Sequence, residues 1–206
     1  MKMAALILAA GAASRFGSIK QLAMINGVPM LQCSIDNAKA FLPNKVFAVL
    51  GSDAEEIKPH ISGCDFLINH QWNRGLGSSI ALGVSHLKHD FDAILIMLGD
   101  QPKVGVHYLE ELGKLFAGEQ VVCSRYRDGT GVPAIFGSHY FDLLINLSAD
   151  IGARELIRSI HPIPKSLSLG GMECDVDYPH DLKQCLFRNQ MIYARVHKSI
   201  RTWHRR

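Results

Sequence analysis

Several features that would indicate common protein classes are missing from this chain. No stretch approaches the roughly 18 consecutive apolar residues that a membrane-spanning helix requires, so we expect no membrane association of that kind. The motifs GxSxG and HExxH are also absent, which leaves hydrolases of those two types without support. The formal net charge is only +3, which is too small to indicate nucleic-acid binding by itself.

Cysteine is scarce, and its pattern indicates no disulfide framework. The five cysteines are odd in number, widely scattered and never arranged as CxxC, which favours reduced thiols in a cytoplasmic protein. They are Cys33, Cys64, Cys123, Cys174 and Cys185. A zinc site built from Cys174, His180 and Cys185 is not favoured, because the spacing matches no common zinc motif. Lys2 and the apolar run after it superficially resemble a secretory signal, but a strand followed by a binding loop explains that run better.

A chain of 206 residues with 48% hydrophobic content is long enough to enclose one substantial core. Segments that predict strands alternate with segments that predict helices, which favours a three-layer α/β/α, Rossmann-like domain with a mostly parallel sheet over residues 1–188. We expect strands at 5–9, 45–50, 65–69, 92–98, 120–124, 133–136 and 166–169. We expect helices at 29–41, 79–87, 108–115, 139–147, 153–160 and 179–187, with a short one ending near 60. Residues 189–206 are basic, contain no acidic residue and form a separate tail or terminal helix.

The stretch over residues 4–22, AALILAAGAASRFGSIKQL, predicts a buried strand, a small-residue turn and two cations. Small side chains after a strand let backbone N–H groups approach a ligand directly, which is how proteins cradle phosphates. Arg15 and Lys20 would add positive charge around such a cradle. The turn is neither a Walker A loop nor a dinucleotide-binding loop, because Phe16 and Ala13 stand where those motifs require glycine. An alanine-rich turn beside two solvated cations is the alternative interpretation.

This stretch resembles the LAAGxSxRxGxxKxL signature of the MobA-like NTP transferase family, which includes the molybdenum cofactor cytidylyl- and guanylyltransferases. The matching residues are Leu8, Ala9, Ala10, Gly11, Arg15, Gly17, Lys20 and Leu22, with Ser14 one position after the serine of the signature. The resemblance covers most of residues 4–187 and implies the nucleotide-diphospho-sugar transferase fold. It also implies that the LAAG residues, Ser14, Arg15 and Lys20 bind the nucleotide, with Arg15 and Lys20 acting in catalysis.

Two aspartates follow predicted strands, where ligands bind in open α/β sheets. Asp100 comes directly after the most apolar strand, where a carboxylate can hold Mg²⁺ against phosphates or cap the helix after Pro102. Its LGDQP segment resembles the family's metal-binding element, which implies a catalytic, metal-binding role. The segment DVDYPHDL resembles the family's DIDTPEDL, which implies Asp177 as the second metal ligand and Asp175 as the substitute candidate. Asp177 could instead cap the helix at Pro179.

A glycine- and serine-rich segment over residues 73–79 resembles the family's loop for the base and ribose. The nucleotide-binding residues that this resemblance implies are Gly75, Gly77, Ser78 and Ser79. A glycine turn with serine caps is the alternative. Residues 131–133 resemble the acceptor-side GHP element, although Val132 replaces its histidine, and residues 150–154 resemble the acceptor-side DxGAR element.

The resemblance implies transfer of a CMP group from CTP and Mg²⁺ to a phosphate-bearing acceptor, with release of pyrophosphate. Ala10 stands where guanylyl-transferring relatives carry glycine, which favours CTP, and the implied acceptor is molybdopterin or the molybdenum cofactor. Transfer to a sugar or alcohol phosphate is an alternative, and a non-catalytic nucleotide- or cofactor-binding chaperone is another. A molybdoenzyme or its chaperone is the implied protein partner, and no membrane or nucleic acid is expected.

Overall fold

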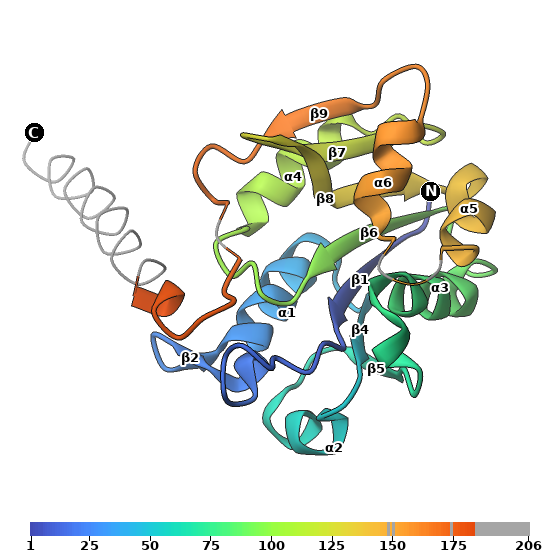
Figure 1. Ribbon diagram of the computed structural model, residues 1–206. Helices are drawn as coiled ribbons and strands as arrows, with labels where there is room; N and C mark the ends of the chain where they lie inside the picture. The colour runs from blue at the N-terminus through green and yellow to red at the C-terminus, as the bar shows by residue number, and fades with distance from the viewer. Residues whose placement is uncertain (148, 150, 174, 184–206) are drawn as a thin grey trace, which may run out of the picture.

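A seven-stranded sheet forms the middle layer of the protein (Figure 1). The computed structural model describes residues 1–147, 149, 151–173 and 175–183. The strands lie in the order β5-β4-β1-β6-β8-β7-β9. They are β1 (Met3–Ala9), β4 (Val46–Leu50), β5 (Asp65–Ile68), β6 (Ala93–Leu98), β7 (Val121–Tyr126), β8 (Gly129–Gly137) and β9 (Lys165–Ser168). The predicted α/β fold class is thereby confirmed.

Alternate residues of β1 face two separate cores, as the period of a strand buried on both sides requires. Ala5 and Ile7 pack in one core, with α1 (Met30–Phe41) and α4 (Val106–Leu115) on that face and the short α2 (Ala54–Ile57) at its edge. Leu6 and Leu8 pack in the other core. The helices on this second face are α3 (Leu76–Leu87), α5 (Phe141–Ile145) and α6 (Ala153–Ser159). Three layers result (Figure 1).

The sheet is mostly parallel, and its chain order reverses beside β1. β1 is parallel to both β4 and β6, whereas β8 runs against both of its neighbours, β6 and β7. Ligands in such sheets bind outside the carboxyl ends of the strands at this reversal. The predicted strand at 133–136 is longer than expected, because residues 129–131 also pair with the end of β7 in a hairpin.

Shorter elements connect these layers. Strands β2 (Met24–Ile25) and β3 (Val28–Pro29) form a separate antiparallel pair before α1. The 3₁₀ turns are η1 (Lys20–Leu22), η2 (Lys58–His60), η3 (Trp72–Arg74) and η4 (Ser138–Tyr140).

Helix α3 begins earlier than predicted. We expected a start near residue 79 with a serine cap, but the helix begins at Leu76, directly after Gly75. Gly75 has φ +94°, a conformation that favours glycine, and it turns the chain from η3 straight into the helix. The alternative that Asp100 caps the helix after Pro102 is wrong, because the residue preceding α4 is Gly105.

The C-terminal predictions are described only in part. Residues 181–183 are helical, whereas the rest of the predicted helix to 187 and the basic tail at 189–206 lie outside the described residues. Within the described ranges, no helix is both long and apolar enough to cross a membrane.

Candidate active site

A cleft of about 590 Å³ lies at the carboxyl ends of β1 and β6. The two strands are in register there, since Leu8 pairs with Leu98 and the N–H of Gly99 donates to Leu8 O at 3.0 Å. Asp100 therefore lies beside the loop that follows β1. Most of the predicted site residues line this cleft: Leu8, Ala9, Ala10, Gly11, Ser14, Arg15, Lys20, Gly75, Ser79, Asp100 and Asp177.

The loop after β1 is held by Gln21, which our sequence analysis did not single out. The Gln21 side chain is buried, and its Nε2 donates to Ala9 O at 2.9 Å and to Gly11 O at 3.0 Å. These bonds hold the loop by its carbonyl oxygens and not by its N–H groups, which are the donors that an anion needs. The only signal in the sequence was the position of Gln21 directly after Lys20.

Gly51 supports the same loop from the neighbouring strand. It follows β4, and a Cβ atom at this position would lie 2.1 Å from Ala10 O and 2.8 Å from the Trp72 Cβ. A side chain does not fit here unless the loop moves. Trp72 itself lines the cleft together with Asn73 and was also missed, although it directly precedes the segment that we had selected.

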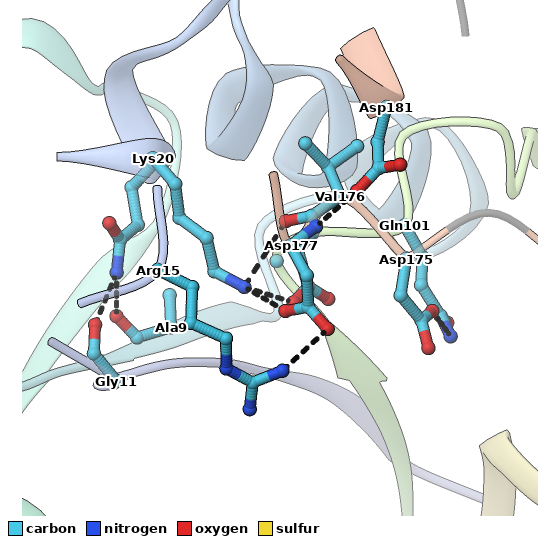
Figure 2. A network of polar contacts seen from close by, with 12 residues as sticks. Ala9, Gly11, Arg15, Lys20, Gln101, Asp175, Val176, Asp177 and Asp181 are labelled. Carbon is cyan, nitrogen blue, oxygen red and sulfur yellow. Dashed lines mark hydrogen bonds and ion pairs between the residues drawn. The ribbon is translucent and has the colours of Figure 1, made fainter. Parts of the chain in front are cut away.

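Four charged side chains meet in the cleft (Figure 2). Lys20 Nζ lies 2.7 Å from Asp100 Oδ2 and 3.3 Å from Asp177 Oδ1, and it also donates to Val176 O at 3.3 Å. Arg15 Nη1 lies 3.6 Å from Asp177 Oδ2. Burial alone would lower the pKa of the Lys20 ammonium, but the Asp100 and Asp177 carboxylates together outweigh it and raise that pKa above its ordinary value.

The Asp100 and Asp177 carboxylates fit a divalent cation. They already share one cation, the Lys20 ammonium, and Asp100 Oδ1 is buried without a hydrogen-bond partner in the described part of the chain. Mg²⁺ typically takes one or two carboxylates and completes its shell with phosphate oxygens and water. Among the described residues, no group of three or more His, Cys, Asp or Glu side chains could hold a metal. A metal here would therefore take its remaining ligands from groups such as nucleotide phosphates and water.

Asp177, and not Asp175, faces the Lys20 ammonium. Asp175 Oδ1 instead accepts a hydrogen bond from Gln101 Nε2 at 2.7 Å (Figure 2). The alternative that Asp177 caps the following helix does not match the contacts. Asp181 Oδ2 accepts the N–H groups of Asp177 at 3.1 Å and Tyr178 at 2.8 Å, whereas the Asp177 carboxylate faces Lys20 and Arg15 and not the turn that follows it.

Gly77 and Ser78 are not brought together with the other predicted residues. Ser78 Oγ donates to Gly75 O at 2.8 Å and accepts from Asn69 Nδ2 at 2.9 Å, and Ser78 lines a separate cavity. Gly77 is buried, and its N–H donates to Ala149 O at 3.1 Å. These contacts stabilise the turn before α3, and direct nucleotide binding by Gly77 and Ser78 stays a prediction.

A second cavity of about 370 Å³ adjoins the cleft, since Leu76 and Leu98 line both. The acceptor-side segments identified in the sequence meet here: Gly131, Val132, Gly152, Ala153 and Arg154 line it. Gln101 and Asp175 lie in the same wall. Asp150 lies outside the described residues, and Pro133 is not among the lining residues.

Comparison with known proteins assigns this chain to a family. The profile described as "MobA-like NTP transferase domain" matches residues 5–163, about three quarters of the chain. This chain belongs to that family. The MobA-like chain is 26% identical to Rv0371c from Mycobacterium tuberculosis H37Rv, whose crystal structure matches 90% of this chain and 97% of Rv0371c with a TM-score of 0.81. Rv0371c has also been solved in complex with manganese, at 25% identity and a TM-score of 0.77, with 90% and 98% covered.

Curated relatives of the MobA-like chain include bifunctional proteins. GlmU from Chromobacterium violaceum is 32% identical over 119 residues, which cover 56% of this chain and 26% of GlmU. The match therefore spans about a quarter of the length of this curated relative. The family and the fold of the MobA-like chain are those of nucleotidyltransferases.

Proposed function

We propose that this MobA-like NTP transferase moves a CMP group from CTP, with Mg²⁺, to a phosphate-bearing acceptor and releases pyrophosphate. Molybdopterin or the molybdenum cofactor is the acceptor that we favour. The observation that carries the proposal is the meeting, in one cleft, of a phosphate-cradle loop and two carboxylates from distant parts of the chain.

Nucleotidyl transfer brings two anions together, because an acceptor phosphate oxygen attacks the α-phosphorus in line with the leaving pyrophosphate. Catalysis then depends chiefly on positioning and charge neutralisation, and no protein nucleophile is required. In this proposal, the Gly11 loop, Arg15 and Lys20 bind the leaving pyrophosphate and stabilise its negative charge. The Arg15 side chain is 66% exposed, so its guanidinium can turn toward a phosphate at little desolvation cost.

Asp100 and Asp177 would hold the Mg²⁺. The bound cation would neutralise phosphate charge and help to orient the α-phosphate. The contribution of the protein at this point is to keep the two carboxylates at a fixed separation. The bond from Val176 N to Asp100 O at 3.2 Å does this, because it ties the two segments together one residue before Asp177.

The second cavity supports an acceptor site next to the nucleotide. It adjoins the cleft, and Arg154 supplies a cation for an acceptor phosphate while its Nη2 lies 3.1 Å from Asp128 Oδ2. Gln101 lies in the same wall, where its Nε2 donates to Asp175 Oδ1 at 2.7 Å and to Tyr126 Oη at 2.8 Å and so fixes the shape of the wall. Val132, where relatives carry histidine, makes this part of the wall less polar.

CTP is favoured over GTP because Ala10 stands where guanylyl-transferring relatives carry glycine. Ala10 is among the residues that line the cleft, and alanine leaves less room at this position than glycine does. The Ala10 backbone has no space to retreat, because Gly51 packs directly against its carbonyl oxygen.

Pyrophosphate release tests the proposal directly. CTP, GTP, ATP and UTP would each be supplied with Mg²⁺, with and without molybdenum cofactor. We expect release with CTP only when the cofactor is present. Release with GTP and the same cofactor would contradict the choice of nucleotide, and release with CTP and another acceptor would contradict the choice of acceptor.

Transfer to a sugar or alcohol phosphate is the second candidate, because the matched GlmU relatives fit it equally well. The same assay with a panel of sugar and alcohol phosphates separates the two candidates. A nucleotide- or cofactor-binding chaperone would behave differently from both. Calorimetry would then detect CTP–Mg²⁺ binding, while no acceptor in the panel would release pyrophosphate.

A further inference from the structure

The ammonium group of Lys20 contacts oxygen atoms of both proposed metal ligands, Asp100 and Asp177. Three oxygen atoms surround Nζ: Asp100 Oδ2 at 2.7 Å, Asp177 Oδ1 at 3.3 Å and Val176 O at 3.3 Å (Figure 2). Carboxylate and carbonyl oxygens are also the ligands that hard divalent cations take. The Lys20 and Asp100 side chains are only 15% and 19% exposed, whereas the Asp177 side chain is 46% exposed, so this contact is partly shielded from water.

We propose that Lys20 fills the metal position when no divalent cation is bound, and that it leaves this position when one binds. The proposal rests on one part of the proposed function, the role of Asp100 and Asp177 as metal ligands. It does not depend on which nucleotide or acceptor the enzyme uses.

Charge balance is the first reason for this displacement. The two carboxylates, Lys20 and Arg15 sum to a formal charge of zero, so these four contacting groups balance one another without a metal. A divalent cation between the carboxylates would lie next to the ammonium. Like charges in a partly dehydrated cleft repel each other more strongly than in water, so both cations cannot occupy the position together.

The location of Lys20 gives its ammonium somewhere to go. Lys20 begins η1, shortly after the Gly11 loop, and both residues line the same cleft. An ammonium on a flexible four-carbon stem can turn from the carboxylates toward phosphates bound by that loop. Phosphates that attract Lys20 would then favour metal binding, and the metal would favour phosphate binding by the same factor. Metal alone should therefore bind weakly.

A permanent ion pair is the competing interpretation. In that case, Lys20 would lock Asp177 to Asp100 whether or not a metal is present. The two interpretations differ in what happens when the ammonium is removed. Metal binding tightens if Lys20 competes for the position, whereas it stays unchanged or weakens if Lys20 only holds the carboxylates in place.

Mn²⁺ binding to the full chain without nucleotide distinguishes them, and electron paramagnetic resonance of free Mn²⁺ measures it. We expect Lys20→Met to bind Mn²⁺ about tenfold more tightly than the unmodified chain, because the competing charge is gone. Lys114→Met is the matched control. Lys114 contacts Glu111 at 2.6 Å and lies with Met1 and Met3 at the opposite end of β1. Mn²⁺ binding to Lys20→Met that is no tighter than binding to Lys114→Met would overturn the proposal.

A second measurement needs no variant, since Lys20→Met leaves two carboxylates without their cation and could fold poorly. Reductive methylation followed by mass spectrometry reports how accessible each lysine amine is. Saturating Mn²⁺ should speed the labelling of Lys20 several-fold and leave Lys114 unchanged at equal ionic strength. Lys20 that stays equally protected with and without Mn²⁺ would overturn the displacement.

Asp100→Asn distinguishes a failure of the Lys20 displacement from a failure of the assignment of Asp100 and Asp177 as metal ligands. We expect this variant to weaken Mn²⁺ binding at least about tenfold, because one of two carboxylate ligands becomes neutral. Unchanged Mn²⁺ binding by Asp100→Asn would overturn the metal assignment and the displacement together. Weakened binding by Asp100→Asn, combined with unchanged binding by Lys20→Met, would overturn the displacement alone.

Discussion

At the scale of single residues, Asp175 and Asp177 stand two positions apart but have different neighbours. Asp177 shares the Lys20 ammonium with Asp100, whereas Asp175 bonds to Gln101 in the adjoining cavity. A strand-like segment points alternate side chains the same way, so spacing alone could not separate these two carboxylates. Their partners do separate them, because only one of the two is positioned to share a cation with Asp100.

Asp100→Asn should retain the fold and lower Mg²⁺-dependent pyrophosphate release at least ~100-fold, since it neutralises a major electrostatic element of the cleft. Initial rates at saturating nucleotide, with circular dichroism to verify folding, provide the measurement. A folded variant with near-normal turnover would show that Asp100 has no catalytic role.

Asp177→Asn should behave like Asp100→Asn, with a loss of about 100-fold, and Asp175→Asn should lose less than about threefold. The reason is that a neutral amide in place of the Asp175 carboxylate could still accept the Gln101 hydrogen bond. An amide in place of the Asp177 carboxylate could not balance the charges of Lys20 and Arg15. A Mg²⁺ titration of pyrophosphate release compares the pair. Larger losses for the Asp175 variant would reverse the assignment of the second metal ligand.

Local pattern was enough to predict that Arg15 and Lys20 lie near the Gly11 loop, because all three belong to one short segment. It could not show that Lys20 contacts Asp100, since 80 positions separate them in the chain. Gln21 was missed for a related reason. Its role depends on burial beneath the loop, and a glutamine in sequence is typical of a surface residue.

At the scale of elements, the phosphate-cradle loop depends on its packing as much as on its own residues. Gly51, at the end of β4, leaves room for the Ala10 carbonyl, whereas a Cβ at Gly11 would meet no atom within 4 Å. Both glycines border the same loop, but one faces its support and the other faces the cleft.

Gly51→Ala should therefore affect mainly stability, whereas Gly11→Ala should affect mainly nucleotide binding. Gly51→Ala should lower the free energy of unfolding by about 1–3 kcal/mol, because the new methyl group overlaps Ala10 O. Gly11→Ala should leave stability almost unchanged and weaken nucleotide binding, because its methyl group enters the cleft. Urea unfolding and nucleotide titration measure the two effects. A Gly51→Ala variant with unchanged stability would show that the loop can shift at little cost in free energy.

A long apolar run made the strand at 92–98 predictable and Pro29 marked the start of the helix at 29–41, and these agree with β6 and α1. Two starts were misplaced by three residues or more. Helix α3 begins at Leu76 because the conformation of Gly75 overrides the serine caps, and β8 begins at Gly129 because a hairpin partner recruits residues that look like a turn.

At the scale of the whole molecule, the site joins the beginning of the chain to its described end. Val176 is fully buried against Phe16, Ile25 and Met30, next to the segment that carries Arg15 and Lys20. This small core holds Asp177 at the cleft after the chain has crossed from β9. The predicted α/β order could not reveal it, and the family match ends at residue 163, before Asp177.

Val176→Ala should weaken Mn²⁺ binding although it changes no charge, and it should lower the free energy of unfolding by about 1–3 kcal/mol. The physical reason is that the small core loses the anchor next to Asp177. Val84→Ala is the matched control, because Val84 is equally buried but packs in the core beneath α3. Equal effects of both variants on Mn²⁺ binding would mean that the anchor has no special importance for the metal.

The late position of Asp177 also sets an order of events during synthesis. Every strand of the sheet, and the loop around Gly11, leaves the ribosome before the second carboxylate does. On the proposed assignment, a nascent or prematurely terminated chain would contain the phosphate-binding loop without a complete cation site. It could bind a nucleotide before it could catalyse nucleotidyl transfer, so the unfinished chain would be inactive.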